Sequence, residues 1–404
     1  MNKNLLIASI IVIAVVASGV YIASNGLDDS DSGTAIIDVK SSAGGVITGS
    51  GEYSNGDRVN LAVITQYGYD FLGWYENDKL LSTDKQYSFK AAGNKTVIAK
   101  HSILHDASFS IDESSSKAPT TLKLKSIYNV EVKTRSWNIT DALTGTSIYS
   151  NSGSNNSLDS ISYNITNGRA LLISQTITYT DGYKTTKTQT AVVDETVKKH
   201  FEWNYQQQAW HSILTQWIWN NKSASWDLSL SFEKYYDYST TSRNYDRTTT
   251  NFQKYITVND PYIQSLAKSL KDFTSDMSAL ERANCVLKFV QSIPYIYDIN
   301  NKGVNEYWNY PYETLWDMKG DCDDHAILYA SLMKAMGYKV AILLLPGHMA
   351  VGLDVSGASG TYYTVGGVKY YYCEATALVG GSWINEYNVG QIPSGYSSAS
   401  VYVL

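Results

Sequence analysis

The chain has 404 residues, of which 44% are hydrophobic and 17% are charged, and its formal net charge is −6. This length exceeds one ordinary domain, so we expect three or four folded units. The acidic balance gives no basic surface of the kind that binds nucleic acid, so no nucleic-acid partner is expected. The three cysteines are too few for a disulfide scaffold.

An uncharged apolar segment occupies residues 5–23. Lys3 precedes it, and three aspartates follow within 28–31. The segment is longer than the apolar core of a signal peptide, roughly 7–15 residues, and approaches the roughly 20 residues that span a bilayer. We therefore predict a transmembrane anchor within residues 1–26, with the N-terminus inside; a cleaved signal peptide is the alternative. Either one places the rest of the chain outside the cytoplasm, anchored to the cell membrane or secreted.

Residues 35–102 have the pattern of a small β module. Val59, Leu61 and Val63 alternate with polar residues, and Gly-Tyr-Asp-Phe-Leu-Gly-Trp-Tyr-Glu-Asn follows at 68–77. This stretch resembles a single internalin-type B repeat, whose signature is Gly-Trp-Tyr after Gly-Tyr-x-Phe. The resemblance implies a spacer or surface-display module without catalytic residues.

Two further β-rich stretches follow. In residues 106–196, short alternating runs separated by Ser, Asn and Gly turns predict an immunoglobulin-like β-sandwich. Residues 197–258 are an aromatic-rich β segment, whose large side chains we expect to pack in a core between sheets. A platform that binds glycan or peptide is the alternative. The tryptophans of this segment are Trp203, Trp210, Trp217, Trp219 and Trp226.

Residues 259–404 change from strand-like to helical texture. Apolar residues at helical spacing predict helices over 263–270 and 280–290. Helices followed by an antiparallel sheet predict an α+β domain. The expected strands are 340–345, 348–353 and 369–376.

A third helix of this domain carries the first candidate site residue. The motif Gly-Asp-Cys-Asp-Asp places Cys322 in the first turn of a helix that ends before Gly337, with Asp321 as its N-cap. Unpaired N–H groups and the positive end of the helix dipole stabilise a thiolate at this position. The neighbouring carboxylates oppose this effect. We expect Asp321 and Asp324 to cap the helix, with their side chains turned from the sulfur.

Two more candidates lie on separate elements. His348 follows Cys322 by 26 residues, and Glu374 follows His348 by another 26. A thiol, an imidazole and a carboxylate are the parts of a nucleophile, its base and the group that orients the base. Strand alternation puts Cys373 on the face opposite Glu374, so a disulfide between Cys373 and Cys322 is not expected. Cys285 lies among apolar helix residues and is predicted to be buried and inert.

His325 is an alternative base, but it shares a helix with Cys322 and would leave no separate wall for a substrate. A metal site formed by Asp321, Asp323, Asp324 and His325 is disfavoured, because consecutive side chains at a helix start diverge. We expect neither a metal nor another cofactor, since the sequence has no nucleotide or haem motif and thiol acyl transfer needs none.

Six ordered motifs resemble the transglutaminase-like superfamily, in particular its secreted bacterial and archaeal members with a cysteine-peptidase-type core. The similarity covers about 260–385. It implies a papain-related α+β core with Cys322 as nucleophile, His348 as general base and then acid, and an acidic third residue. The family usually has Asp in that third place, where this chain has Glu374. The backbone N–H of Cys322 would meet the oxyanion, with Trp308 or Tyr310 as a second donor. The six motifs are Phe-Val-Gln-Ser-Ile-Pro-Tyr at 289–295, Tyr-Pro-Tyr-Glu-Thr-Leu at 310–315, Gly-Asp-Cys-Asp-Asp at 320–324, Gly-Tyr at 337–338, Pro-Gly-His-Met-Ala-Val-Gly at 346–352 and Tyr-Cys-Glu-Ala-Thr at 372–376.

The expected function is therefore an extracytoplasmic thiol acyl-transfer enzyme that acts on amide bonds through a thioester on Cys322. Water as acceptor would make it a cysteine peptidase or amidase, and an amine would make it a protein transamidase. The expected partner is a protein or peptide substrate, including a cell-wall or surface polymer. The alternative is an inactive cell-surface adhesion or binding protein with the same fold.

Overall fold

The computed structural model describes residues 33–128, 130–154, 157–243, 251–376, 387–396 and 398–404. The chain divides after Asp106 into two compact units. None of the helices within the described ranges is both long and apolar enough to cross a membrane. The predicted anchor, residues 1–26, lies outside the described residues.

The first unit is a β module with one apolar core. A five-stranded sheet (β3-β1-β8-β5-β6) and a three-stranded sheet (β2-β4-β7) enclose Trp74, which is fully buried and donates from Nε1 to the carbonyl of Asp84 at 3.0 Å. Gly73 has a φ of +140°, and a Cβ there would lie 2.7 Å from the Ser82 carbonyl oxygen, which explains the glycine before the tryptophan. The strands are β1 Thr34–Ser41, β2 Gly45–Thr48, β3 Gly51–Ser54, β4 Arg58–Thr65, β5 Tyr69–Glu76, β6 Lys79–Ser82, β7 Gln86–Lys90 and β8 Lys95–Ile103.

The second unit begins with a β-sandwich, as predicted. A three-stranded antiparallel sheet (β13-β10-β9) and a four-stranded antiparallel sheet (β12-β11-β14-β15) share one apolar core around Trp137. Its immunoglobulin-like kinship and the boundaries at 196 and 258 stay predictions. The strands are β9 Phe109–Glu113, β10 Thr120–Ser126, β11 Val132–Asp141, β12 Ser147–Ser154, β13 Ser160–Ile165, β14 Arg169–Tyr179 and β15 Lys184–Val193.

A long two-stranded ribbon follows the sandwich. Strands β16 (Thr196–His211) and β17 (Gln216–Ser231) pair antiparallel along their whole length. A short helix, α1 (Phe232–Ser239), then begins at the N-cap Ser231, which the sequence analysis did not anticipate.

The aromatic side chains of the ribbon do not pack between sheets. Trp203 packs edge-on against Phe289 at 5.2 Å, and Trp226 against Phe273 at 5.7 Å, so both contact helices. Trp217 and Trp219 are exposed, and for them the prediction of core packing is wrong. The side chain of Trp210 lies outside the described residues.

The last domain is α+β, as predicted. Its helices are α2 (Pro261–Phe273), α3 (Ala279–Gln291), α4 (Asp298–Asn301), α5 (Pro311–Asp317) and α6 (Cys322–Ala335), preceded by a 3₁₀ turn at Asn251–Tyr255. Its five-stranded antiparallel sheet has the order β20-β21-β19-β18-β22. The strands are β18 Lys339–Leu345, β19 His348–Asp354, β20 Tyr362–Val365, β21 Val368–Cys373 and β22 Ser400–Val403.

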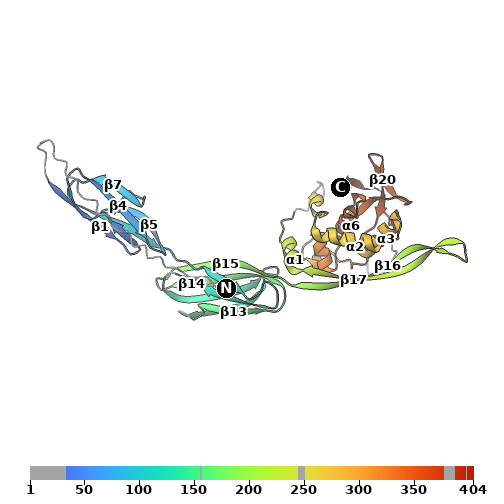
Figure 1. Ribbon diagram of the computed structural model, residues 1–404, viewed down its shortest axis with the longest axis horizontal. Coiled ribbons are helices and arrows are strands. Elements are labelled where there is room, and N and C mark those ends of the chain that lie inside the picture. The colour runs from blue at the N-terminus through green and yellow to red at the C-terminus, as the bar shows by residue number, and fades with distance from the viewer. Residues whose placement is uncertain (1–32, 129, 155–156, 244–250, 377–386, 397) are drawn as a thin grey trace. The chain divides into compact units, whose positions relative to one another are not determined.

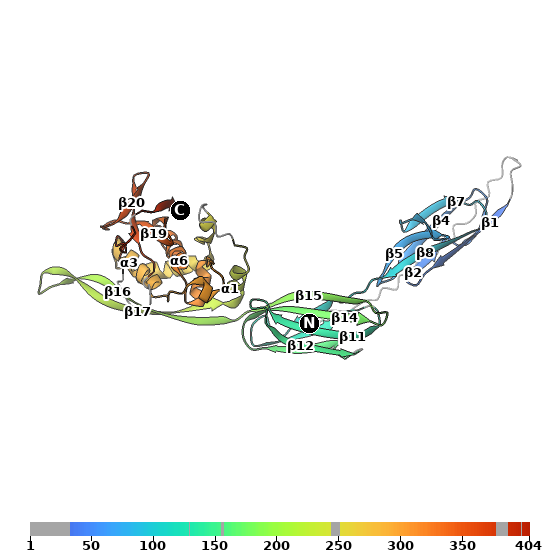
Figure 2. The same cartoon turned by 180° about the vertical axis from the view of Figure 1, so that it is seen from behind.

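Three layers build this domain, as Figures 1 and 2 show. The helices lie between the β16–β17 ribbon on one side and the sheet on the other. Phe289 on α3 contacts Phe201 and Trp203 of the ribbon, while α6 lies against β18 and β19. One continuous apolar core joins the layers. The candidate residues lie where α6 meets the sheet.

Candidate active site

Cys322 is the first residue of α6 and is buried, with 7% of its surface exposed. The first N–H groups of a helix have no acceptor within the helix, so the start of α6 directs amide hydrogens toward the region of the sulfur. The Cys322 thiol donates to Oδ1 of Asp323 at 3.6 Å.

The predicted capping is confirmed. Asp321 accepts from the N–H of Asp323, and Asp324 accepts from the N–H of Asp321, which forms a capping box. Asp324 also accepts two bonds from Asn309, at 2.7 and 2.9 Å. A Cβ on Gly320 would lie 2.7 Å from Oδ2 of Asp324, so the glycine of the motif makes room for this carboxylate.

The expectation that these carboxylates turn away from the sulfur is wrong for Asp321. An oxygen of Asp321, the sulfur of Cys322 and an oxygen of Asp323 all lie within 4.8 Å of one another. Oxygens of Asp298, Asp321 and Asp324 form a second group of the same size. A cation could bridge either group, but the capping bonds already explain why Asp321 and Asp324 lie there, and we assign no metal.

His348 and Glu374 form a direct pair. His348 opens β19 after a tight turn in which Gly347 has a φ of +66°. Its Nε2 lies 3.1 and 3.0 Å from the two carboxylate oxygens of Glu374, which follows the last residue of β21. Nε2–H is therefore the donor, and Nδ1 is the ring nitrogen left to accept a proton.

Several groups hold Glu374 in place and keep it ionised. Burial alone would raise the pKa of Glu374, but the hydrogen bond and charge of His348, with donors from Thr376 and Tyr372, outweigh it and lower that pKa. The Tyr372 hydroxyl donates at 2.8 Å and the Thr376 N–H at 3.1 Å, and the Thr376 hydroxyl also donates. Gln291 at the end of α3 donates to the Glu374 carbonyl at 2.7 Å.

Tyr396 packs against the candidate base, His348. Its ring stacks on the imidazole of His348 with centroids 5.1 Å apart and planes 22° apart. Burial raises the pKa of the Tyr396 hydroxyl, and the charges of Glu374 and Cys322 raise it further. The ring of Tyr396 therefore forms one wall against the imidazole of His348.

The other predicted roles have clear positions. His325 is fully buried, neither ring nitrogen has a hydrogen-bond partner among the described residues, and burial lowers its pKa to about 4. It is thus a neutral core histidine near neutral pH. The N–H of the fully buried Trp308 donates to Glu306 at 2.6 Å, which argues against Trp308 as an oxyanion donor.

The remaining two cysteines are buried. Burial raises the pKa of Cys285 to about 11, in keeping with an inert thiol. Cys373 belongs to the core that contains the helices, whereas its neighbour Tyr372 belongs to the core on the other side of the sheet. The predicted alternation in β21 is confirmed. None of the three cysteines forms a disulfide.

Two family models match parts of this chain. Residues 36–103 match a divergent InlB B-repeat domain, and residues 261–365 match a transglutaminase-like domain. The C-terminal part of the protein therefore contains a transglutaminase-like domain. Cys322 and His348 lie inside this match, and Glu374 lies nine residues beyond its end. A search of curated proteins found no match.

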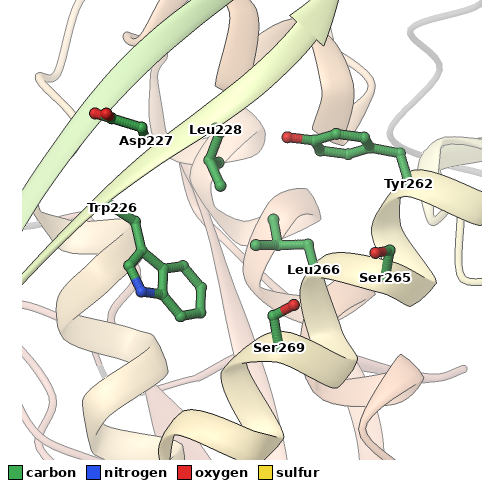
Figure 3. Close-up of a pocket in the computed structure, with 7 residues that line it drawn as sticks. All are labelled: Trp226, Asp227, Leu228, Tyr262, Ser265, Leu266 and Ser269. Carbon is green, nitrogen blue, oxygen red and sulfur yellow. The ribbon is translucent and has the colours of Figure 1, made fainter.

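A surface pocket lies away from these residues, between β17 and α2 of the transglutaminase-like domain (Figure 3). Its volume is about 310 Å³, and none of the candidate site residues lines it. Trp226 and Tyr262 contribute aromatic rings to its wall. The pocket is therefore separate from the candidate active site, because it has no residue in common with it. The lining residues are Trp226, Asp227, Leu228, Tyr262, Ser265, Leu266 and Ser269.

Sequence reasoning missed the residues that support the pair. Tyr372 and Thr376 could have been found, because strand alternation already placed them on the face of Glu374. Gln291 and Tyr396 lack such a signal, since they lie 83 residues before and 22 residues after Glu374. Only the folded chain brings them together.

Proposed function

We propose that the transglutaminase-like domain is a thiol acyl-transfer enzyme that attacks amide carbonyls through Cys322. The observation that carries this proposal is the buried pair in which Glu374 holds Nε2–H of His348. Such a pair fixes the tautomer and orientation of an imidazole that acts as a base. The domain match supports a papain-related core around it.

The proposed reaction uses Cys322 as nucleophile and His348 as its base. Nδ1 of His348 takes the proton of the Cys322 thiol as the sulfur bonds to the amide carbonyl carbon. The oxyanion that forms is met by N–H groups at the start of α6. When the C–N bond breaks, the imidazolium returns the proton to the leaving amine and a thioester remains. Water or a second amine then attacks the thioester carbonyl, and His348 accepts the proton of this nucleophile. The C–S bond breaks, the acyl product leaves, and the imidazolium returns the proton to the sulfur of Cys322.

We further propose that the protein acts outside the cytoplasm on a protein, peptide or surface polymer, held by a membrane anchor in residues 1–26. The uncharged segment 5–23 supports this placement. The B-repeat module and the sandwich would then serve as spacers between the anchor and the enzyme.

The test is to trap the thioester. The full-length protein is incubated with a glutamine-containing peptide and hydroxylamine, and peptide hydroxamate and acyl-Cys322 are measured by mass spectrometry. We expect both products in the wild type and neither in Cys322→Ser. Cys285→Ala, which changes a buried thiol elsewhere, is the matched control and should keep both. Product in Cys322→Ser would refute the proposal.

A binding protein without catalysis is the second candidate. The bond from the Cys322 thiol to Asp323 favours it, because the partner in this bond is a carboxylate, which opposes a negative charge on the sulfur. In that case iodoacetamide at neutral pH would label Cys322 no faster than a free thiol, and Cys322→Ala would retain ligands as well as the wild type. Faster labelling that His348→Ala abolishes would exclude it.

A further inference from the structure

The distal end of the β16–β17 ribbon extends beyond the helices of the transglutaminase-like domain (Figure 1). Gln207 and Gln208 contact the helical layer, through Asp276 at 2.9 Å and Glu281 at 2.6 Å. Beyond them the strands continue to a turn over 212–215. We call residues 209–219 the ribbon tip.

The ribbon tip exposes large apolar side chains. Ile213 at the turn is 87% exposed and Leu214 is 53% exposed, while Trp217 and Trp219 are 62% and 50% exposed. Trp217 and Trp219 are two residues apart in β17, so their side chains share one face of the ribbon. Four such residues lie on one projecting hairpin, and a concentration of exposed large apolar side chains usually marks an interaction site.

The charge pattern around the tip is as unusual as its apolar content. No Asp or Glu occurs between Trp203 and Trp226, and the only Lys or Arg in this stretch is Lys222, with His211 as its only histidine. Exposed β-strands normally carry charged residues that prevent association. Their absence removes the groups that an apolar or anionic surface would repel.

These features fit a lipid surface better than a protein. The tip is a convex turn with aliphatic residues at its apex and tryptophans behind them, which is the order of side chains that enter a bilayer interface. Tryptophan places its ring at the level of the headgroups and keeps its N–H near water. Lys222 lies three residues behind Trp219, where it can meet anionic headgroups.

We propose that the ribbon tip inserts into the interface of an anionic lipid bilayer. Ile213 and Leu214 enter the acyl boundary, and Trp217 and Trp219 lie among the headgroups. The transglutaminase-like domain would thereby rest on the membrane through its own contact, in addition to any anchor at the N-terminus. This inference does not depend on the proposed catalytic activity.

A local probe tests the insertion without interference from the N-terminal segment. Full-length protein carrying Cys322→Ser receives an environment-sensitive fluorophore at Ile213→Cys or, as matched control, at Ser225→Cys, an exposed site on the same ribbon. Each is mixed with phosphatidylcholine vesicles, with or without phosphatidylglycerol, that contain a doxyl-lipid quencher. We expect a blue shift and about threefold stronger quenching at 213 than at 225, increased by phosphatidylglycerol.

Two further variants sharpen the result. Leu214→Ser with Trp217→Ser should remove the quenching at 213, and Lys222→Gln should weaken only the preference for phosphatidylglycerol. Equal quenching at 213 and 225, or none at either, would overturn the proposal. So would a blue shift that needs added peptide or protein, because the tip would then be a protein-docking surface.

Discussion

The B-repeat module and the transglutaminase-like domain differ in the kind of side chain that they bury. Among the described residues of the first module, every fully buried side chain is apolar. The transglutaminase-like domain instead buries many polar and ionisable groups, concentrated around α6 and the ends of β19 and β21. Its buried ionisable side chains include Glu281, Lys288, Asp298, Glu313, Asp323, Asp324, His325, His348 and Glu374.

This difference separates a fold that only has to be stable from one that carries a site. A buried ionisable group destabilises a protein unless partners satisfy it, so a domain that keeps several has a use for them. The B-repeat module has no such groups and fits a spacer. The predictions below test that division.

The largest expected effect concerns Glu374. Glu374→Gln should lower the turnover of a peptide amide by about 10³- to 10⁴-fold, because a neutral amide no longer fixes the Nε2–H tautomer of His348. Glu374→Asp, which keeps the negative charge on a side chain one methylene shorter, should lose less. Steady-state kinetics of both variants measure this, with circular dichroism to verify folding. Equal losses in the two would show that the length of the side chain matters as much as its charge at this position.

Unfolding of the B-repeat module should leave the activity of the transglutaminase-like domain unchanged. Trp74→Ala removes a fully buried ring and its bond to the Asp84 carbonyl, and should destabilise that module by about 3–5 kcal/mol. Calorimetry should show one early transition while peptide turnover stays at the wild-type level. Loss of turnover would mean that the module does more than separate the enzyme from its attachment.

Asp298 should make the transglutaminase-like domain less stable as the pH rises. Burial, then the charge of Asp321, raises the pKa of Asp298 from its ordinary value of 3.8 to about 7. Between about pH 4 and 7 the folded protein keeps a proton that the unfolded chain has released, so the free energy of unfolding falls with pH.

Asp298→Asn should therefore stabilise the domain by about 2 kcal/mol at pH 8 and have little effect at pH 4. Thermal melts of both proteins across this range measure the difference. A stabilisation that is the same at both pH values would contradict the explanation, because a neutral amide can replace only a penalty that ionisation creates.

The smallest expected effect concerns Tyr396. Tyr396→Ala removes the ring that stacks on His348 and should reduce turnover about tenfold through looser positioning of the imidazole. Tyr396→Phe keeps the stack on His348. Its turnover, and the dependence of that turnover on pH, should match those of the wild type. If Phe fails as badly as Ala, the hydroxyl rather than the ring is what the site needs.

Local signals made much of the transglutaminase-like domain predictable. The start of α6, its Asp321 cap and the hairpin at His348 follow from capping residues, apolar runs and glycine turns that act over a few positions. The pairing of His348 with Glu374 was also expected. The catalytic role of the three candidates stays a prediction that the trapping experiment addresses.

What could not be predicted depends on distant contacts. The contact of Tyr396 with His348 depends on the path of the chain after Glu374, and no periodic pattern in the sequence indicates that path. The exposure of Trp217 and Trp219 was missed because composition cannot tell that a ribbon is longer than the helices it covers. The hydrogen bonds from Asn309 to Asp324 were missed as well, because 15 residues separate the two and no local pattern records the contact.

The helix α3 links the ribbon to the site. Glu281 near its start accepts the ribbon's Gln208 N–H, and Gln291 at its end donates to the backbone of Glu374. A tilt of α3 would therefore move Glu374, whose carboxylate accepts the hydrogen bond from His348. Binding of the ribbon tip to a membrane could thus change the position of Glu374 through α3. Amide hydrogen exchange along α3 should then become slower when vesicles are added.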